Sequence, residues 1–264
     1  MMIVSVLGVY LSLWALTANA VAIAPLPSGC DCAGTAFNSS LAKEVFCGDP
    51  RLGPIDYQSH DSKAIVPITR TWHRLGRLCP GEFLKRWTNK DGRFIYPIED
   101  GFQLDSHKHA IKQTAVLCPG TLVDRFGGEQ GSFLAPAGMR YEARSIPPSN
   151  LVTVTGRKEP NSSPFNYHVY MVLKPMQVTA GCIAPWFEQP GLGVQYLING
   201  SVTAAIQEGF LRKFDGQKSA LLARERRQAC GTCKPTSLSC PGYQDNFDLL
   251  AGGMRPTGLQ RLFY

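Results

Sequence analysis

The chain has 264 residues, of which 44% are hydrophobic, 10% aromatic and 18% charged. This composition suits a globular protein of one or two domains and excludes a disordered tail protein, a collagen-like repeat and a coiled coil. The net charge of +7 comes largely from two basic stretches, Arg70–Arg93 and Arg212–Lys234. Such stretches are most simply solvated faces, and without an aromatic-studded recognition motif they do not predict nucleic-acid binding.

The first 20 residues are typical of a secretory signal peptide. They carry no charged side chain, contain the apolar run Ile3–Leu16 and end in Ala18-Asn19-Ala20, which has the small-residue pattern of a cleavage site. An uncleaved membrane anchor is the alternative, but the apolar run is short for a span. We therefore predict a secreted, extracellular or cell-surface protein without stable membrane insertion.

Nine cysteines follow the predicted signal peptide. In an exported protein cysteines more often form disulfides than bind metal, and with an odd number one is free or pairs between chains. They are Cys30, Cys32, Cys47, Cys79, Cys118, Cys182, Cys230, Cys233 and Cys240. Three N-glycosylation motifs, at Asn38, Asn161 and Asn199, add to the prediction of an exported glycoprotein.

Residues 21–113 read as a loop-rich region punctuated by prolines. A helix is predicted over Pro80–Trp87, where Phe83, Leu84 and Trp87 share one face. A short strand is predicted over Arg93–Tyr96. With cysteines clustered at its start, the region is expected to be stapled by disulfides.

From Thr114 the pattern changes to short β-prone segments separated by tight turns. Ser201 is a suitable N-cap for a helix over Val202–Phe210, and a second helix is predicted over Lys218–Gln228. The predicted strands cover Thr114–Leu117, Thr121–Asp124, Leu151–Thr155, Tyr167–Leu173, Met176–Thr179 and Val194–Ile198. This arrangement predicts an α+β fold with a compact, mainly antiparallel β core and peripheral helices.

Several common catalytic motifs are absent from the sequence. It has no G-x-S-x-G elbow and no Walker A loop, and Gly191-Leu192-Gly193 lacks the third glycine of a dinucleotide fingerprint. His107 and His109 flank a lysine and could share one side of a strand, but they are more typical of a solvated loop. Cys230 and Cys233 have zinc-ligand spacing, yet no complete ligand set accompanies them. No metal site can be placed.

Three segments combine side chains that a nucleotide site requires: Gly120–Gly128, Arg144–Pro148 and Ala184–Tyr196. The guanidinium fork of an arginine matches phosphate oxygens in charge and geometry, and aromatic faces can stack on planar heterocycles. Arg125 and Arg144 are therefore candidate pyrophosphate ligands, and Phe126 and Trp186 are candidate stacking residues. From spacing alone, each arginine would more often be a surface salt-bridge partner and each aromatic a core residue.

In this order the three segments resemble the TNT domain, named for the tuberculosis necrotizing toxin. Together with Gly131-Ser132-Phe133 and Tyr167–Val172, they are similar to the secreted fungal NAD glycohydrolases that contain this domain. The resemblance implies a TNT-like catalytic domain over residues 114–212, followed by a C-terminal extension over residues 213–264.

The resemblance also implies an activity and its residues. It predicts hydrolysis of the N-glycosidic bond of NAD, and of NADP as a further candidate substrate, to nicotinamide and ADP-ribose. The motifs D-R-[FY]-G and G-x-G-x-Q-[YF] make Arg125 and Gln195 the expected catalytic residues. Arg144 is expected to contact the phosphates, Phe126 to line the site, and His168 to contribute to substrate binding. Trp186 joins the expected substrate-binding residues because its ring can stack on a heterocycle.

No cofactor is expected for the chemistry, because NAD is the substrate. The resemblance implies a homodimer and a structural or regulatory calcium ion, whose site the dispersed acids of the extension do not reveal. Two alternatives stay open. A protein ADP-ribosyltransferase would use a glutamate, and Glu188 lies near the matched Gln195. A non-enzymatic surface-binding protein would use the basic faces and turn over no NAD.

Overall fold

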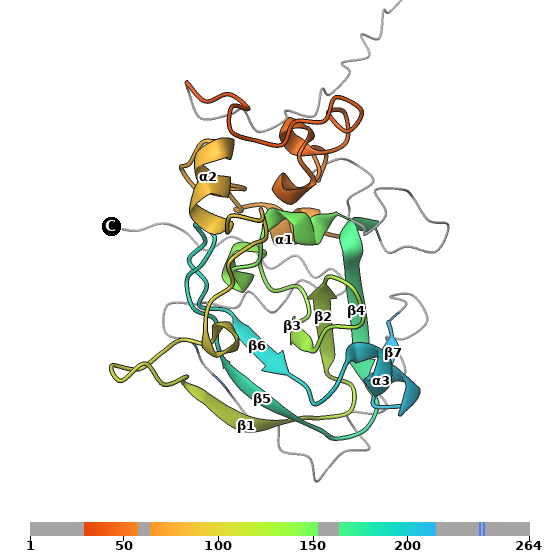
Figure 1. Cartoon of the computed structure of the whole chain (residues 1–264). Coiled ribbons are helices and arrows are strands. Elements are labelled where there is room, and N and C mark those ends of the chain that lie inside the picture. Colours follow the sequence, from red (N-terminus) through yellow and green to blue (C-terminus); the bar gives the residue numbers. More distant parts are fainter. Residues whose placement is uncertain (1–28, 58–63, 153–163, 215–237, 239, 241–264) are drawn as a thin grey trace, which may run out of the picture.

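The computed structural model describes residues 29–57, 64–152, 164–214, 238 and 240. Seven strands form one sheet in the order β1-β5-β6-β3-β2-β4-β7, in which every neighbouring pair is antiparallel (Figure 1). The strands are β1 Lys112–Leu117, β2 Leu122–Phe126, β3 Phe133–Pro136, β4 Tyr167–Val172, β5 Met176–Cys182, β6 Val194–Leu197 and β7 Leu211–Lys213. The predicted α+β class with an antiparallel core is confirmed.

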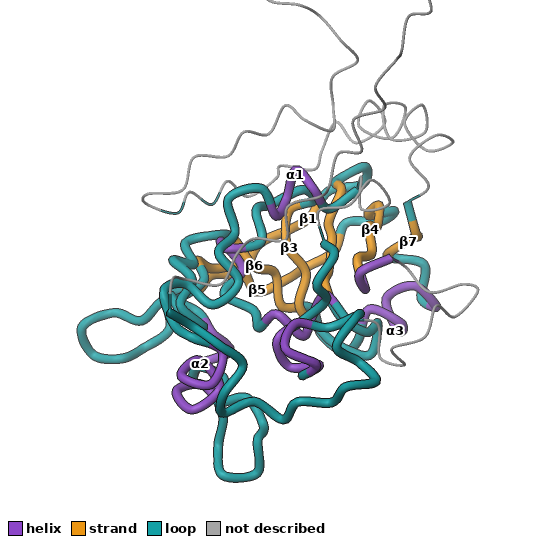
Figure 2. The backbone as a smooth tube through the Cα atoms, turned by 90° about the horizontal axis from the view of Figure 1, so that it is seen from above, coloured by secondary structure: helices purple, strands orange, loops and turns teal. Residues whose placement is uncertain are grey.

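The helices are short and peripheral. The α-helices are α1 Val66–Thr69, α2 Pro80–Trp87 and α3 Val202–Gln207. Single 3-10 turns occupy Phe46–Gly48, Pro50–Leu52, Glu99–Gly101, Glu142–Arg144, Pro148–Leu151 and Pro164–Asn166. Figure 2 shows α2 set apart from the strands, on the side of the long loops. Within the described part of the chain, no helix has the length and apolar character needed to cross a membrane.

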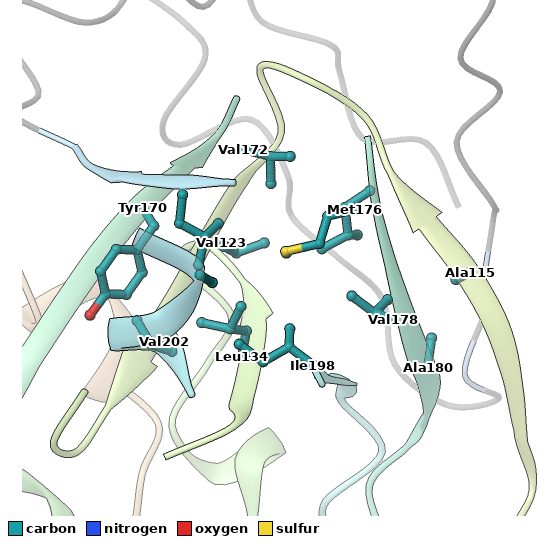
Figure 3. Close-up of a cluster of buried hydrophobic side chains, with 13 residues drawn as sticks. Ala115, Val123, Leu134, Tyr170, Val172, Met176, Val178, Ala180, Ile198 and Val202 are labelled. Carbon is teal, nitrogen blue, oxygen red and sulfur yellow. The ribbon is translucent and has the colours of Figure 1, made fainter. Parts of the chain in front are cut away.

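The main core lies inside the curve of the sheet. One apolar cluster includes side chains from both end strands, Ala115 of β1 and Leu211 of β7. Val178 of β5 and Val202 of α3 belong to the same cluster (Figure 3). A sheet that brings its first and last strands around one apolar cluster must be strongly bent, since inward and outward side chains alternate along each strand. Burial of these aliphatic side chains drives the closure.

The two predicted helices that fall within the described residues begin where their caps indicate. Pro80 occupies the first turn of α2, and Glu82 accepts a hydrogen bond from the Cys79 N–H at 3.0 Å, which satisfies one free amide of the helix start. Ser201 caps α3 by accepting from the Ala204 N–H at 3.1 Å. The α2 bounds agree with the prediction, and α3 ends at Gln207, before Gly209 with its positive φ of 73°.

The predicted strand at Arg93–Tyr96 is wrong, and most of the one at Leu151–Thr155 lies outside the described residues. Arg93–Tyr96 forms only an isolated bridge between Phe94 and Thr88, because the chain packs against the end of α2 and then enters Pro97, which has no N–H to continue a ladder. The start of the Leu151–Thr155 segment belongs instead to the 3-10 turn at Pro148–Leu151, where Pro148 fixes a helical φ.

The loop-rich N-terminal region is packed into the same body as the sheet. Trp72 and Ile68 share an apolar cluster with Phe126 of β2, and Phe83 of α2 shares another with Phe187. Disulfides Cys30–Cys79 and Cys32–Cys47 staple its start, as predicted. Cys182 of β5 pairs with Cys240, and Cys118 is also disulfide-bonded.

Several predictions fall outside the described residues. These are the signal peptide at 1–20, the glycosylation motif at Asn161, the helix at Lys218–Gln228, and the Cys230 and Cys233 pair. Of the C-terminal extension, only Lys213, Phe214, Leu238 and Cys240 are described.

Candidate active site

Arg125 lies on β2, and its guanidinium is held by hydrogen bonds to the glycine-rich segment that follows the strand. Its Nε donates to the Gly128 carbonyl at 2.8 Å and its Nη1 to the Phe133 carbonyl at 2.9 Å. A side chain at Gly131 could not coexist with this geometry, because a Cβ there would lie 1.9 Å from Nη2. The absence of a side chain at Gly131 therefore lets the turn close around the arginine.

Within the described part of the chain, no acidic side chain neutralises the charge of Arg125. Among the described carboxylates none forms an ion pair with it, and burial lowers the pKa of its guanidinium. A half-buried cation that has lost water without gaining a counter-ion is a favourable receptor for an anionic group. Arg144, the other candidate pyrophosphate ligand, differs from Arg125 because a carboxylate does pair with it.

Arg144 forms a buried ion pair. Its Nη1 and Nη2 bind the two carboxylate oxygens of Asp124 at 2.5 and 2.8 Å, and Nε and Nη2 also donate to the Met139 carbonyl. The exposed fractions of the two side chains are 5% and 0%. Asp124 also accepts from the Gly138 N–H and from the hydroxyl of Tyr167. The Arg144 guanidinium thus binds Asp124 and Met139 in this structure, and its predicted contact with the phosphates stays a prediction.

Phe126 is buried beside this pair. Its ring packs edge-on against Tyr141 at 5.0 Å and lies 5.0 Å beneath the Arg144 guanidinium, and its exposed fraction is 3%. Asp124 and Phe126 alternate with Arg125 along β2, so they project from the opposite face of the strand. The structure thus brings Phe126 and Arg144 together, behind the face that carries Arg125.

His168 stands directly opposite Arg125 in the β2–β4 register. Its Nε2 lies 3.2 Å from Asn166 Oδ1, and its Nδ1 lies 3.9 Å from a Glu129 oxygen. Glu129 also accepts from the Tyr170 hydroxyl at 2.8 Å and pairs with Lys213 at 3.0 Å. Sequence reasoning missed Glu129, although it follows the D-R-F-G motif closely, because only the folded strands show what its carboxylate meets.

Burial lowers the pKa of His168, and Lys213 and Arg125 lower it further against the opposing effect of Glu129. The folded pKa lies below the ordinary value of 6.5, so the unfolded chain takes up a proton first as the pH falls. The stability that depends on neutral His168 is therefore present above pH 6.5 and lost below it. We expect His168→Gln to flatten the fall in Tm between pH 7 and pH 5. An unchanged slope in thermal melts would contradict this.

Gln195 lies on β6, separated from β2 by β3 in the sheet order. Its side chain is half-buried, and its Nε2 donates to the backbone carbonyl of Asp100 at 2.7 Å. The structure therefore brings Arg125 and His168 together but gives Gln195 a different partner, from the N-terminal region.

Trp186 also reaches that region. Its Nε1 donates to the Ile95 carbonyl at 2.7 Å, and its ring lies 5.0 Å from Trp87 of α2. Part of the indole is accessible, which leaves it able to contact a ligand as well as the core.

Among the described residues, no group of three or more His, Cys, Asp or Glu side chains could hold a metal ion. His107 and His109 are solvent-exposed, as expected for a loop. The acids of the C-terminal extension that could contribute to a calcium site, Asp215, Glu225, Asp245 and Asp248, lie outside the described residues.

Known proteins resemble this chain in both sequence and structure. A conidial surface nicotinamide adenine dinucleotide glycohydrolase of Aspergillus fumigatus is 40% identical over 190 residues, which cover 70% of this chain and 76% of that protein. The sequence model of the family described as "Tuberculosis necrotizing toxin" matches residues 116–214.

Two solved structures show weaker likenesses. The tuberculosis necrotizing toxin complexed with its immunity factor is 19% identical with a TM-score of 0.41, covering 64% of this chain and 88% of that one. Tse6 in complex with Tsi6 is 15% identical with a TM-score of 0.26, covering 39% and 72%. These likenesses carry no functional argument. The sequence relationships do, and the chain belongs to the tuberculosis necrotizing toxin (TNT) domain family, as a relative of the fungal surface glycohydrolase.

Proposed function

We propose that the protein is a secreted or surface NAD glycohydrolase that cleaves the N-glycosidic bond of NAD to nicotinamide and ADP-ribose. The observation that carries this is the 40% identity to a fungal surface NAD glycohydrolase over 76% of that protein's length. The identity spans far more than a single motif. NAD is then the substrate, and the protein acts as a hydrolase without a redox cofactor.

The chemistry of this reaction suits the side chains of the candidate site. Nicotinamide leaves from a cationic nitrogen, so its departure needs little acid assistance, and the ribose develops oxocarbenium character. A site can then work by orientation and electrostatics. Arg125 binds the pyrophosphate with its uncompensated charge, while the Gln195 carboxamide orients the ribose hydroxyls or the attacking water.

The other four predicted substrate-binding residues differ in how accessible they are to a ligand. Trp186 and His168 present partly accessible rings to a ligand, whereas Phe126 and Arg144 are buried. Direct contacts of Phe126 and Arg144 with NAD rest on the resemblance alone. In the structure, Phe126 and Arg144 pack together on the face of β2 opposite to Arg125 and thereby stabilise that strand.

Homodimer formation, a calcium ion and glycosylation are finer proposals, supported by the resemblance. Asn38 and Asn199 are exposed, which glycosylation requires. The extension expected to take part in dimerisation lies mostly outside the described residues. Use of NADP also remains a proposal.

The function is tested by nicotinamide release from NAD, NADP and NADH by the purified secreted protein, with and without a calcium chelator. Release from NAD is expected, and NADH is the chemical control, since neutral dihydronicotinamide is a far poorer leaving group than nicotinamide. Folded protein that releases no nicotinamide from NAD at any calcium concentration would refute the proposal and favour the surface-binding alternative.

A transferase is distinguished by the fate of the ADP-ribose. Hydrolysis yields one free ADP-ribose for each nicotinamide, even when acceptor proteins are present. A deficit of free ADP-ribose matched by label on protein would indicate the ADP-ribosyltransferase instead, for which the partly buried Glu188 is the nearest candidate. In the structure Glu188 pairs with Arg86 at 3.0 Å.

A further inference from the structure

Three consecutive residues before β1 have left-handed backbone conformations. Their φ angles are 51° at Glu99, 56° at Asp100 and 77° at Gly101. Left-handed φ is ordinary for glycine but costs other residues of the order of 1 kcal/mol or more each. Two adjacent non-glycine residues in this region persist only if their surroundings hold them.

The end of β5 holds this turn. The Gly101 carbonyl accepts from the Ala184 N–H at 2.9 Å, and the Gln103 N–H donates to the Cys182 carbonyl at 2.8 Å. Between them Phe102 is 1% exposed and lies against Gly181, where a Cβ would come within 2.5 Å of its ring. The β5 glycine therefore makes room for the residue that anchors the turn.

This docking places the turn beside Gln195. Gly181 is the β5 partner of Gln195 in the β5–β6 register, and the Asp100 carbonyl accepts from Gln195 Nε2 at 2.7 Å. A carboxamide whose NH₂ group is held by a fixed carbonyl has its orientation set, so its Oε1 turns away from that carbonyl and is available as an acceptor. The exposed Asp100 side chain takes no part, and only the backbone does.

We propose that the Glu99–Gly101 turn is a positioning element of the NAD site, which orients Gln195 through the Asp100 carbonyl. The turn lies outside the family match at residues 116–214, so the N-terminal region completes the catalytic site as well as supporting the fold. This inference rests on the proposed function and on the role of Gln195 in it.

Asp100→Pro tests the turn, since proline cannot adopt φ of 56° and the carbonyl must move. We expect kcat for NAD to fall by about 10- to 100-fold, because small misplacements of reacting groups have effects of this size, with a smaller change in KM. In a Gln195→Ala background the same change is expected to have no further effect on kcat. Equal losses in both backgrounds, or no loss in either, would overturn the proposal.

Lys108→Pro is the matched control. Lys108 has φ of 66° in an exposed turn, where its N–H donates to the Asp105 carbonyl at 3.0 Å. The described hydrogen bond of Gln195 goes to Asp100 and not to this turn, so replacing Lys108 should leave turnover unchanged. Wild-type turnover is measured alongside. Its absence would defeat the proposed function, whereas turnover without coupling between Asp100 and Gln195 would defeat this inference alone.

Gln195→Glu provides a second test that leaves the turn intact. Glutamate keeps the acceptor oxygens but cannot donate to the Asp100 carbonyl. A carboxylate near an oxocarbenium-like ribose would by itself assist the reaction, so a fall in kcat would come from the lost orientation. We expect a loss of at least tenfold. Full activity in this variant would show that the Asp100 contact is dispensable.

Discussion

Gln195→Ala is expected to lower kcat for NAD hydrolysis by about 100- to 1000-fold, the effect of removing one preorganised polar group from a transition-state site. The loss should fall on kcat more than on KM, because in the proposed mechanism the carboxamide acts on the reacting ribose and Arg125 binds the pyrophosphate. Tm should change little, since the side chain is half-buried and its one hydrogen bond goes to a backbone carbonyl at the surface.

The control for this variant is Gln177→Ala. Gln177 is an exposed glutamine on the adjacent strand β5. It lies opposite Val116 of β1, whereas Gly181 is the β5 partner of Gln195, so activity should be retained. Nicotinamide release at saturating NAD and thermal melts measure both variants. Full activity of Gln195→Ala in folded protein would remove Gln195 from the catalytic assignment.

Elements with strong local signals could be predicted from sequence. The start of α2 is fixed by Pro80 and by the hydrogen bond that Glu82 accepts from the Cys79 N–H. The start of α3 is fixed by the side chain of Ser201, which accepts from the Ala204 N–H. The strand Tyr167–Val172 is aromatic and β-branched, and it also follows local preference. These features need no knowledge of the rest of the chain.

Elements defined by partners could not be predicted. Strand β3 at Phe133–Pro136 is short and ends in proline, and it exists because β2 and β6 flank it. Strand β7, of three residues, is completed by pairing with β4. Conversely, Arg93–Tyr96 has strand-like residues but no neighbouring strand to pair with. Pairing over long sequence distances decides these cases.

The site shows the same division. The sequence grouped Arg125 with Arg144 because both are arginines in motif-like segments. Asp124, beside Arg125, already held a usable signal: neighbours on a strand face opposite ways, so its carboxylate was placed to meet something other than Arg125. That its partner is Arg144, 20 residues away, depends on tertiary structure. The Asp100–Gln195 contact joins residues 95 positions apart in the sequence. Because Asp100 contributes its backbone carbonyl, which every residue has, the type of residue at position 100 could not reveal the contact.

Asp124→Ala is expected to lower the free energy of unfolding by about 3–5 kcal/mol, the cost of leaving a buried charge without its partner. The change strands the Arg144 guanidinium, which is 5% exposed, and removes the acceptor of the Gly138 N–H and the Tyr167 hydroxyl. Burial raises the pKa of Tyr167 well above its usual range, and the Asp124 carboxylate raises it further, so this hydroxyl remains a donor. Urea unfolding measures the loss, and an exposed-pair control such as Glu99→Ala should cost far less.

The double variant Asp124→Asn/Arg144→Met separates the two roles of Arg144. It removes both charges and keeps an acceptor oxygen for Gly138 and Tyr167, so it should be more stable than either single variant, because no buried charge is left unpaired. In this folded background the phosphate contact implied by the family resemblance predicts a rise of at least about tenfold in KM for NAD, the value of one charge-assisted hydrogen bond. An unchanged KM would assign Arg144 to the ion pair alone and leave pyrophosphate binding to Arg125, whose guanidinium has no carboxylate partner among the described residues. A double variant no more stable than Asp124→Ala would instead show that the buried pair is not the source of the loss.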